Sequence, residues 1–206
     1  VFRFSILYPV RIGAAFTRMI ILASSSPRRR ELMSMIGLNF VIETSGEEEV
    51  QPVGLPPAEY VKTLALQKAR PVADLHPHDC VIGADTIVLL DGDVLGKPHT
   101  PDVAKRYLTR MQGRTHTVFT GLAVLKDGRA DVRHCETIVT FAPMTAAEIE
   151  AYVATGEPLD KAGAYGVQGP GGVFVERIEG NYFNVIGLPL PLLYAMLVDA
   201  GEMRRG

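Results

Sequence analysis

Hydrophobic residues recur along the chain with two different periods, and the change of period separates strands from helices. Short apolar runs between turn residues are typical of strands, whereas apolar residues three or four positions apart are typical of helices. The pattern predicts strands over residues 20–23, 40–42, 80–90, 94–95, 118–125, 132–141, 173–178 and 182–186. It predicts helices over residues 27–36, 57–70, 101–112, 146–155 and 189–199. This alternation indicates a mixed α/β fold that contains antiparallel hairpins.

Turn and capping residues define several boundaries of these elements. Thr145 and Glu148 form the sequence pattern of a capping box, in which each side chain bonds the other residue's backbone N–H. Pro71 is expected to end the second helix, because proline lacks the N–H that a helix interior requires. The last two predicted strands, 173–178 and 182–186, are expected to pair as a hairpin.

The overall composition excludes several classes of protein. The chain has 206 residues, a net charge of -2, 47% hydrophobic residues and 21% charged residues, which is typical of a globular protein. Without a surplus of positive charge, it is expected to bind neither a nucleic-acid polymer nor a membrane surface. Its apolar runs fall short of the roughly 18 residues that a membrane span needs. The two cysteines, Cys80 and Cys135, suit a reduced cytoplasmic protein better than a disulfide-bonded secreted one.

Residues 1–18 differ from the rest of the chain. They contain three arginines and no acidic residue, and Met19 directly precedes the first strand. An organelle presequence has this composition, so import remains an alternative to a simple N-terminal extension, which we favour. We therefore expect an extension over 1–18 and one compact domain with a cleft over 19–206.

Three consecutive arginines, Arg28, Arg29 and Arg30, occupy the first turn of the predicted helix that begins at Pro27. A helix N-terminus carries partial positive charge, so cations there are unfavourable unless an anion lies in front of them. A strand, a serine-rich turn and guanidinium groups together are suited to bind phosphate. Alternatively, the arginines extend into solvent or pair with Glu31.

Asp85 lies inside a run that is apolar on both faces, where a carboxylate needs a cation, a metal or several donors. Lys97, across the following turn, is its expected partner. A three-residue turn over 91–93, or a bulge with the same effect, would place both side chains on one face of the hairpin, so we predict that register. A structural ion pair without chemistry remains the alternative.

Three further features carry polar groups that suit a binding cleft. Lys68 falls on or beside the apolar stripe of its helix, so its ammonium either extends into solvent or enters a cleft. Gln168 lies in a glycine-rich stretch, and its amide could recognise a planar polar group. Glu49 belongs to an acidic triplet that is by default a solvated loop but that could hold Mg²⁺ together with Asp85.

Four ordered motifs resemble those of the Maf family of nucleoside triphosphate pyrophosphatases. They are Leu22–Arg29, Gly83–Thr86, Gly96–Pro98 and Gly156–Gly169, and the resemblance extends from Met19 to about Gly201. It implies the mixed α/β fold of the inosine triphosphatase-like enzymes, with a long curved sheet, flanking helices and a cleft between two lobes. It also implies hydrolysis of a nucleoside triphosphate between the α and β phosphates, with Mg²⁺ or Mn²⁺ as cofactor.

The same resemblance implies roles for particular residues. It assigns Ser24 and Arg29 to the phosphate-binding turn, Lys68 and Lys97 to the cleft, Glu49 and Asp85 to the metal, Asp85 to proton acceptance, and Arg28, Thr86 and Gln168 to substrate preference. The last three residues resemble the branch that acts on dTTP and UTP. A homodimer is also expected by resemblance.

Two other functions remain open at this point. One is a nucleotide-binding regulator of cell division without significant turnover, and the other is a phosphatase that releases phosphate stepwise. The intact acids and lysines favour an enzyme over a binding protein, and the sequence lacks a phosphatase-type nucleophile motif.

Overall fold

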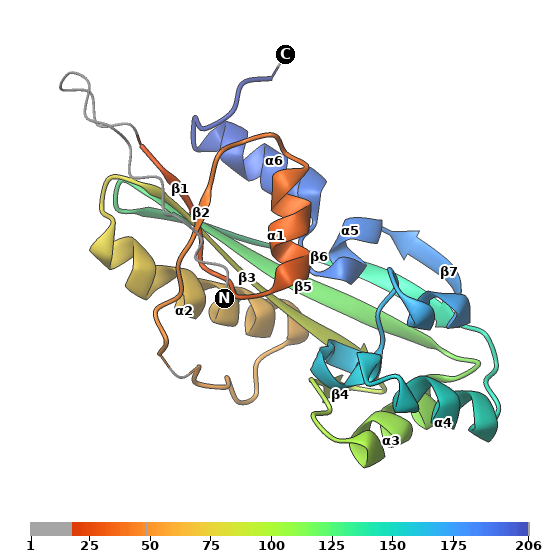
Figure 1. The fold of residues 1–206 in the computed structure, drawn as a ribbon. Helices are drawn as coiled ribbons and strands as arrows, with labels where there is room; N and C mark the ends of the chain where they lie inside the picture. The colour runs from red at the N-terminus through yellow and green to blue at the C-terminus, as the bar shows by residue number, and fades with distance from the viewer. Residues whose placement is uncertain (1–17, 48, 206) are drawn as a thin grey trace, which may run out of the picture.

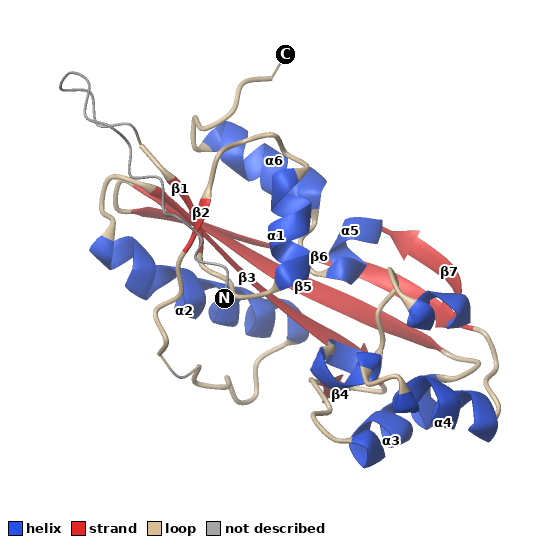
Figure 2. Cartoon of the chain, in the orientation of Figure 1, coloured by secondary structure: helices blue, strands red, loops and turns tan. Residues whose placement is uncertain are grey.

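The fold is built on a seven-stranded sheet (Figures 1 and 2). The computed structural model describes residues 18–47 and 49–205. The strands are β1 (Ile20–Leu22), β2 (Val41–Ile42), β3 (Cys80–Leu90), β4 (Asp93–Leu95), β5 (Thr115–Lys126), β6 (Arg129–Phe141) and β7 (Val175–Gly180). Their order in space is β2-β1-β3-β5-β6-β7, with β4 paired to β3 outside this path. β1 pairs in parallel with β2 and β3, and the other pairings are antiparallel.

One edge of β3 changes partner along its length. β5 pairs with the opposite edge from Val81 to Leu89. On the first edge, β1 pairs with Cys80–Ile82 and β4 pairs with Val88–Leu90. Among the described strands, none pairs with this edge between these two segments, so the sheet splits there. Asp85 and Thr86, which point to opposite faces of β3, both lie at the split.

Helices cover both faces of the sheet (Figure 1). They are α1 (Pro27–Ser34), α2 (Pro57–Leu75), α3 (Pro101–Met111), α4 (Ala146–Ala154), α5 (Tyr182–Ile186) and α6 (Leu190–Asp199), with short 3-10 helices η1 (Glu157–Asp160), η2 (Ala162–Ala164) and η3 (Pro170–Phe174). α2 packs on one face, and α1, α5 and α6 lie on the other. None of the helices within residues 18–47 and 49–205 combines the length and hydropathy of a membrane-spanning helix.

Two strand glycines let α2 contact the sheet directly. A Cβ atom on Gly83 would lie 2.3 Å from the Ala65 carbonyl oxygen, and one on Gly121 would lie 2.2 Å from the Val61 carbonyl oxygen. Any side chain at either position would therefore push the helix away. The close contact brings the next turn of α2, which carries Lys68, to the split in the sheet.

The apolar core divides between two lobes that share the long strands. In the first lobe, α2 packs on one face of the sheet and α1 and α6 pack on the other, around Leu22, Leu32 and Leu193. In the second lobe, α3 and α4 pack around the far ends of β3, β5 and β6. The shared strands fix the relative position of the lobes, and the site lies where the lobes meet.

Most predicted elements are present, and their capping chemistry explains why. Thr145 and Glu148 form the predicted capping box at α4, and Ser26 caps α1 with Pro27 in the first helical position. The hairpin predicted over residues 173–186 is wrong in its second half. Residues 182–186 form helix α5, because the Asn181 side chain accepts a hydrogen bond from the Asn184 N–H and begins a helix.

Two further expectations about local structure are wrong. α2 continues through Pro71 to Leu75, and Val72, fully buried beyond the proline, anchors this last turn in the core. The β3–β4 turn has two residues, not three, because Asp91 and Gly92 both adopt positive φ angles of 54° and 86°. Of the N-terminal extension, only Arg18 falls within the described residues, where it pairs with Asp127 at 3.4 Å.

Candidate active site

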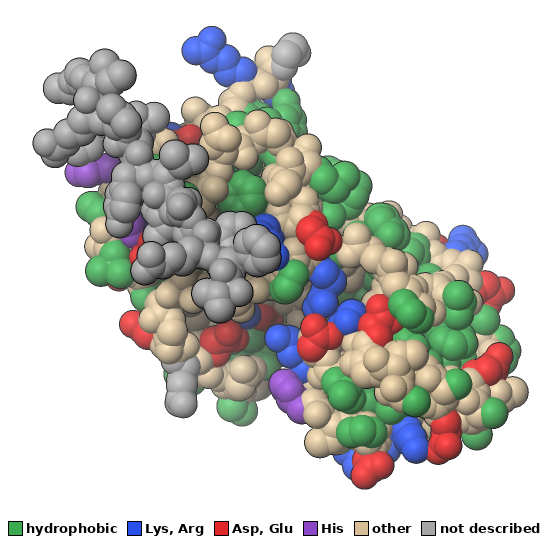
Figure 3. Space-filling model, in the orientation of Figure 1, with side chains coloured by type: hydrophobic (Ala, Val, Ile, Leu, Met, Phe, Trp, Pro, Cys, Tyr) green, Lys and Arg blue, Asp and Glu red, His purple; other side chains and the backbone are tan. Residues whose placement is uncertain are grey.

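Two contiguous hollows lie between the lobes. The larger, of about 880 Å³, is lined by the Ser24–Arg29 turn, residues 44–47, 49 and 50, and α2. The smaller, of about 360 Å³, is lined by the centre of β3, by residues 157–169 and by residues 185–187. The residues that line both are Ser26, Arg28, Arg29, Lys68 and Lys97. Four positive side chains therefore meet at the junction, and Figure 3 shows acidic and basic side chains gathered between the lobes.

The turn between β1 and α1 presents hydroxyl groups and a helix N-terminus to the larger hollow. Ser24 follows the buried strand β1 and is itself buried. Ser26 caps α1 by accepting a hydrogen bond from the Arg29 N–H at 3.5 Å. The first turn of α1 contains no acidic residue to neutralise its positive end. This arrangement is suited to bind an anion.

Arg29 is the most enclosed cation of the site, with 9% of its surface exposed. Its Nε donates to the Gly187 carbonyl at 2.8 Å, Nη1 donates to Ser24 Oγ at 3.2 Å, and Nη2 donates to Thr86 Oγ1 at 3.1 Å. Burial lowers the pKa of Arg29, and the nearby Asp85 opposes that shift. The guanidinium thus joins the Ser24–Arg29 turn, the split in the sheet and the residues that follow α5.

Asp85 pairs with Lys68 rather than with the predicted Lys97. The Lys68 Nζ contacts Asp85 Oδ1 and also lies 3.3 Å from Glu49 Oε1. The two-residue turn explains the correction, because it does not bring Lys97 onto the face of Asp85, and β4 ends at Leu95 before Lys97 is reached. Asp85 is 8% exposed, yet it lines the smaller hollow.

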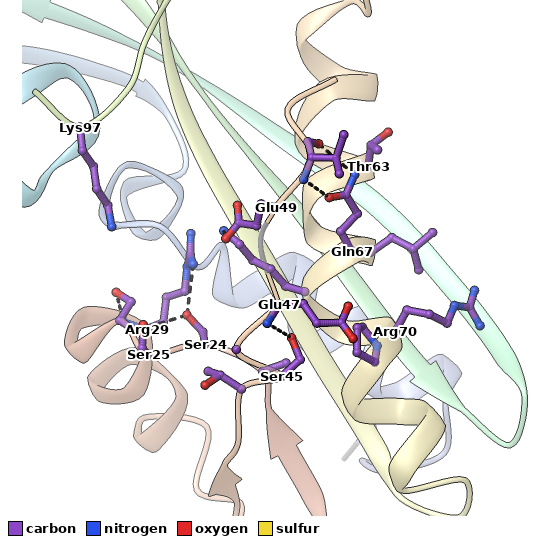
Figure 4. A pocket seen from close by; sticks show the side chains of 18 of the residues that line it. Ser24, Ser25, Arg29, Ser45, Glu47, Glu49, Thr63, Gln67, Arg70 and Lys97 are labelled. Atoms are coloured by element: carbon purple, nitrogen blue, oxygen red, sulfur yellow. Dashed lines mark hydrogen bonds and ion pairs between the residues drawn. The ribbon is translucent and has the colours of Figure 1, made fainter. Parts of the chain in front are cut away.

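Lys97 and Arg28 reach the junction from opposite lobes. Lys97 is exposed, has no ion pair within the described part of the chain, and points toward the hollow that Arg29 also faces (Figure 4). Arg28 Nη1 lies 3.4 Å from Asp160 Oδ2 of η1, so this exposed pair bridges the lobes. Both side chains are free to exchange their present surroundings for an anionic ligand.

The lining of the smaller hollow includes apolar side chains beside its charged and polar groups. Its apolar and aromatic lining includes Val88, Val118, Ala162, Tyr165, Val167, Val185 and Ile186. Thr86 Oγ1 lies 2.9 Å from Thr120 Oγ1, and the exposed Gln168 lies on the loop between η2 and η3. Glu157 Oε2 accepts a hydrogen bond from the Gly171 N–H at 3.0 Å and so fixes that loop. Apolar side chains next to hydrogen-bonding groups are suited to bind a planar organic ring.

The carboxylates suit a hard divalent cation. Glu49 and Asp85 converge on one ammonium group, and carboxylate oxygens are the ligands that Mg²⁺ and Mn²⁺ prefer. Within residues 18–47 and 49–205, no cluster of three or more His, Cys, Asp or Glu residues could hold a metal by itself. Two carboxylates fit Mg²⁺, which usually completes its shell with water and substrate phosphate.

The structure brings all of the predicted site residues to the two hollows. Sequence reasoning missed Asp160, Glu157, Thr120 and the Gly187 carbonyl. Thr120, the polar residue in the otherwise apolar run 118–125, was a usable signal of the same kind as Asp85. The Gly187 carbonyl had none, because its partner Arg29 lies 158 positions away.

The fold and the site are those of an α/β protein with a cleft lined by positive side chains. The family model described as "Maf-like protein" matches residues 19–200. The chain is 53% identical over 184 residues to a dTTP/UTP pyrophosphatase of Moorella thermoacetica (88% of this chain, 95% of that protein). It is 49% identical over 190 residues to one of Shewanella denitrificans (88% and 96%). The chain therefore belongs to the Maf family.

A solved structure confirms the predicted fold class. The Staphylococcus aureus Ham1 protein superposes with a TM-score of 0.53 at 14% sequence identity, covering 89% of this chain and 100% of that chain. At this identity the likeness concerns the fold alone.

Proposed function

We propose that this protein hydrolyses dTTP and UTP to the nucleoside monophosphate and pyrophosphate, assisted by Mg²⁺ or Mn²⁺. The observation that carries the proposal is the meeting of Arg28, Arg29, Lys68 and Lys97 at the junction of two hollows, beside Asp85. The names of the relatives, dTTP/UTP pyrophosphatase, support this substrate class.

We place the polyphosphate at the junction and the pyrimidine base in the smaller hollow. Serine hydroxyls, the N-terminus of α1 and positive side chains suit phosphates. The apolar walls near Thr86 and Gln168 suit the base, with Arg28 at the boundary. The bond between the α and β phosphates then lies near Asp85.

Hydrolysis of a phosphoanhydride depends chiefly on position and charge. Asp85 orients the attacking water and accepts its proton, and Lys68 holds the Asp85 carboxylate in place. Arg29, Lys68 and Lys97 neutralise the negative charge that accumulates on the leaving pyrophosphate. A divalent cation held by Glu49 and Asp85 would supply further charge neutralisation at the phosphates.

The test is to incubate the protein with each common triphosphate in Mg²⁺ or Mn²⁺ and to identify the products. Monophosphate plus pyrophosphate, with dTTP and UTP turned over fastest, is the expected result. Diphosphate plus orthophosphate would identify a phosphatase instead. Binding without turnover would identify a nucleotide-binding regulator.

We also propose that residues 19–206 form a single domain and that the protein acts in the cytoplasm. Cys80 and Cys135 are free thiols, which supports a reducing compartment. The homodimer stays a prediction.

A further inference from the structure

Thr86, like Asp85, is a polar residue of β3 that lines the smaller hollow, and its hydroxyl has two protein partners. Arg29 Nη2 donates to Thr86 Oγ1 at 3.1 Å, and Thr120 Oγ1 lies 2.9 Å from the same atom. The distance alone does not say which threonine donates in the second bond. The answer decides what Thr86 can offer to a ligand.

Thr120 settles that direction. It lies on β5 directly opposite Thr86, is 0% exposed, and donates to the Asn184 carbonyl oxygen at 3.2 Å. A carbonyl oxygen can only accept, and a hydroxyl has one proton. When Thr120 gives its proton to Asn184, the proton between the two threonines must come from Thr86.

The alternative direction is less favourable by one hydrogen bond. The chain from Arg29 to Thr86, to Thr120, to Asn184 contains three bonds that all run the same way, which is the arrangement that strengthens each member. If Thr120 instead donated to Thr86, its bond to the Asn184 carbonyl would be lost. Buried polar groups strongly favour the arrangement with the most bonds.

Thr86 therefore offers the hollow an acceptor and no donor. Its proton goes to Thr120, one lone pair accepts from Arg29, and the second lone pair remains for a ligand. Uracil and thymine carry an N–H at the central position of their Watson–Crick edge, whereas cytosine carries an unprotonated nitrogen there.

We propose that Thr120 is a positioning residue for base selection, which fixes the proton of Thr86 so that the site selects uracil and thymine over cytosine. This inference rests on the proposed function. A donor on the base gains a bond to Thr86 at no cost. An acceptor on the base forms one only if either the bond between Thr86 and Thr120 or the bond from Thr120 to Asn184 is lost. One net hydrogen bond corresponds to a preference of up to about tenfold in kcat/KM.

The test compares kcat/KM for UTP and CTP, measured by pyrophosphate release, in the wild type and in Thr120→Val and Thr120→Ser. Valine keeps the shape of threonine but frees the Thr86 proton to face the hollow. We expect the UTP/CTP ratio to fall by about five- to tenfold in Thr120→Val, chiefly because CTP turnover rises. Thr120→Ser retains the hydroxyl and should keep the wild-type ratio. An unchanged ratio in a folded Thr120→Val would overturn the inference.

A second measurement needs no variant. In 3-deaza-UTP a C–H group replaces the central N–H, so the wild-type protein should process it up to about tenfold less efficiently than UTP. Equal efficiency would also overturn the inference. Failure of the wild type to release pyrophosphate from UTP at all would instead refute the proposed function, so the two failures are distinguishable.

Discussion

Asp85→Asn removes the charge of the proposed proton acceptor and keeps its shape. Asp85 shares Lys68 with Glu49, whose Oε1 lies 3.3 Å from the Lys68 Nζ. After the substitution Lys68 keeps Glu49 as a carboxylate partner. The free energy of unfolding should therefore fall by only about 1–2 kcal/mol, less than the 3–5 kcal/mol typical of a buried charge left without a partner. The loss of kcat should be about 10²- to 10⁴-fold, which is the usual contribution of a positioned base.

Three measurements separate these effects. Pyrophosphate release from UTP gives kcat, calorimetry in the presence of Mg²⁺ gives UTP affinity, and urea unfolding gives stability. Glu202→Gln is the matched control, because Glu202 and Lys126 form a 2.6 Å pair with both side chains 14% exposed, away from both hollows. The control should lose stability but keep kcat. Near wild-type kcat in Asp85→Asn, or loss of UTP binding together with kcat, would refute the assigned role.

Three more predictions concern stability and specificity. Burial lowers the pKa of His116 from 6.5 to about 4, so the unfolded chain takes up its proton first as pH falls. The free energy of unfolding should drop by about 1.4 kcal/mol per pH unit between these values, and His116→Gln should lose this part of the pH dependence. Gly121→Ala should cost about 3 kcal/mol in urea unfolding, because its Cβ would meet α2; unchanged stability would exclude that contact. Gln168→Glu should change the ranking of bases in kcat/KM by up to about tenfold, and an identical ranking would remove Gln168 from base contact.

Local chemistry accounts for the parts of the fold that the sequence could predict. Caps such as Thr145 with Glu148 act within one turn, so they are visible in a short window of sequence. The helix over 182–186 was missed because its aromatic and β-branched residues favour strands, while the cap at Asn181 decides the outcome. The Asp-Gly pair at 91–92 is typical of a two-residue turn. A three-residue turn was predicted instead because it would place Asp85 and Lys97 on one face of the hairpin.

In the site, the sequence indicated which residues are unusual but not which residues they contact. The unusual positions of Arg29, Lys68 and Asp85 were visible as violations of local rules. Their partners were not, since the contact between Lys68 and Asp85 depends on how closely α2 approaches the sheet at Gly83. The Thr120 bond to Asn184 likewise spans 64 positions and exists only after the fold has formed.

The position of the cleaved bond tests the central claim most directly. The wild-type protein is incubated in Mg²⁺ with UTP analogues in which a methylene group replaces either the α,β or the β,γ bridging oxygen. The account predicts that the β,γ-methylene analogue is cleaved to UMP and that the α,β-methylene analogue stays intact. Release of orthophosphate from the α,β-methylene analogue, with the β,γ-methylene analogue untouched, would contradict it.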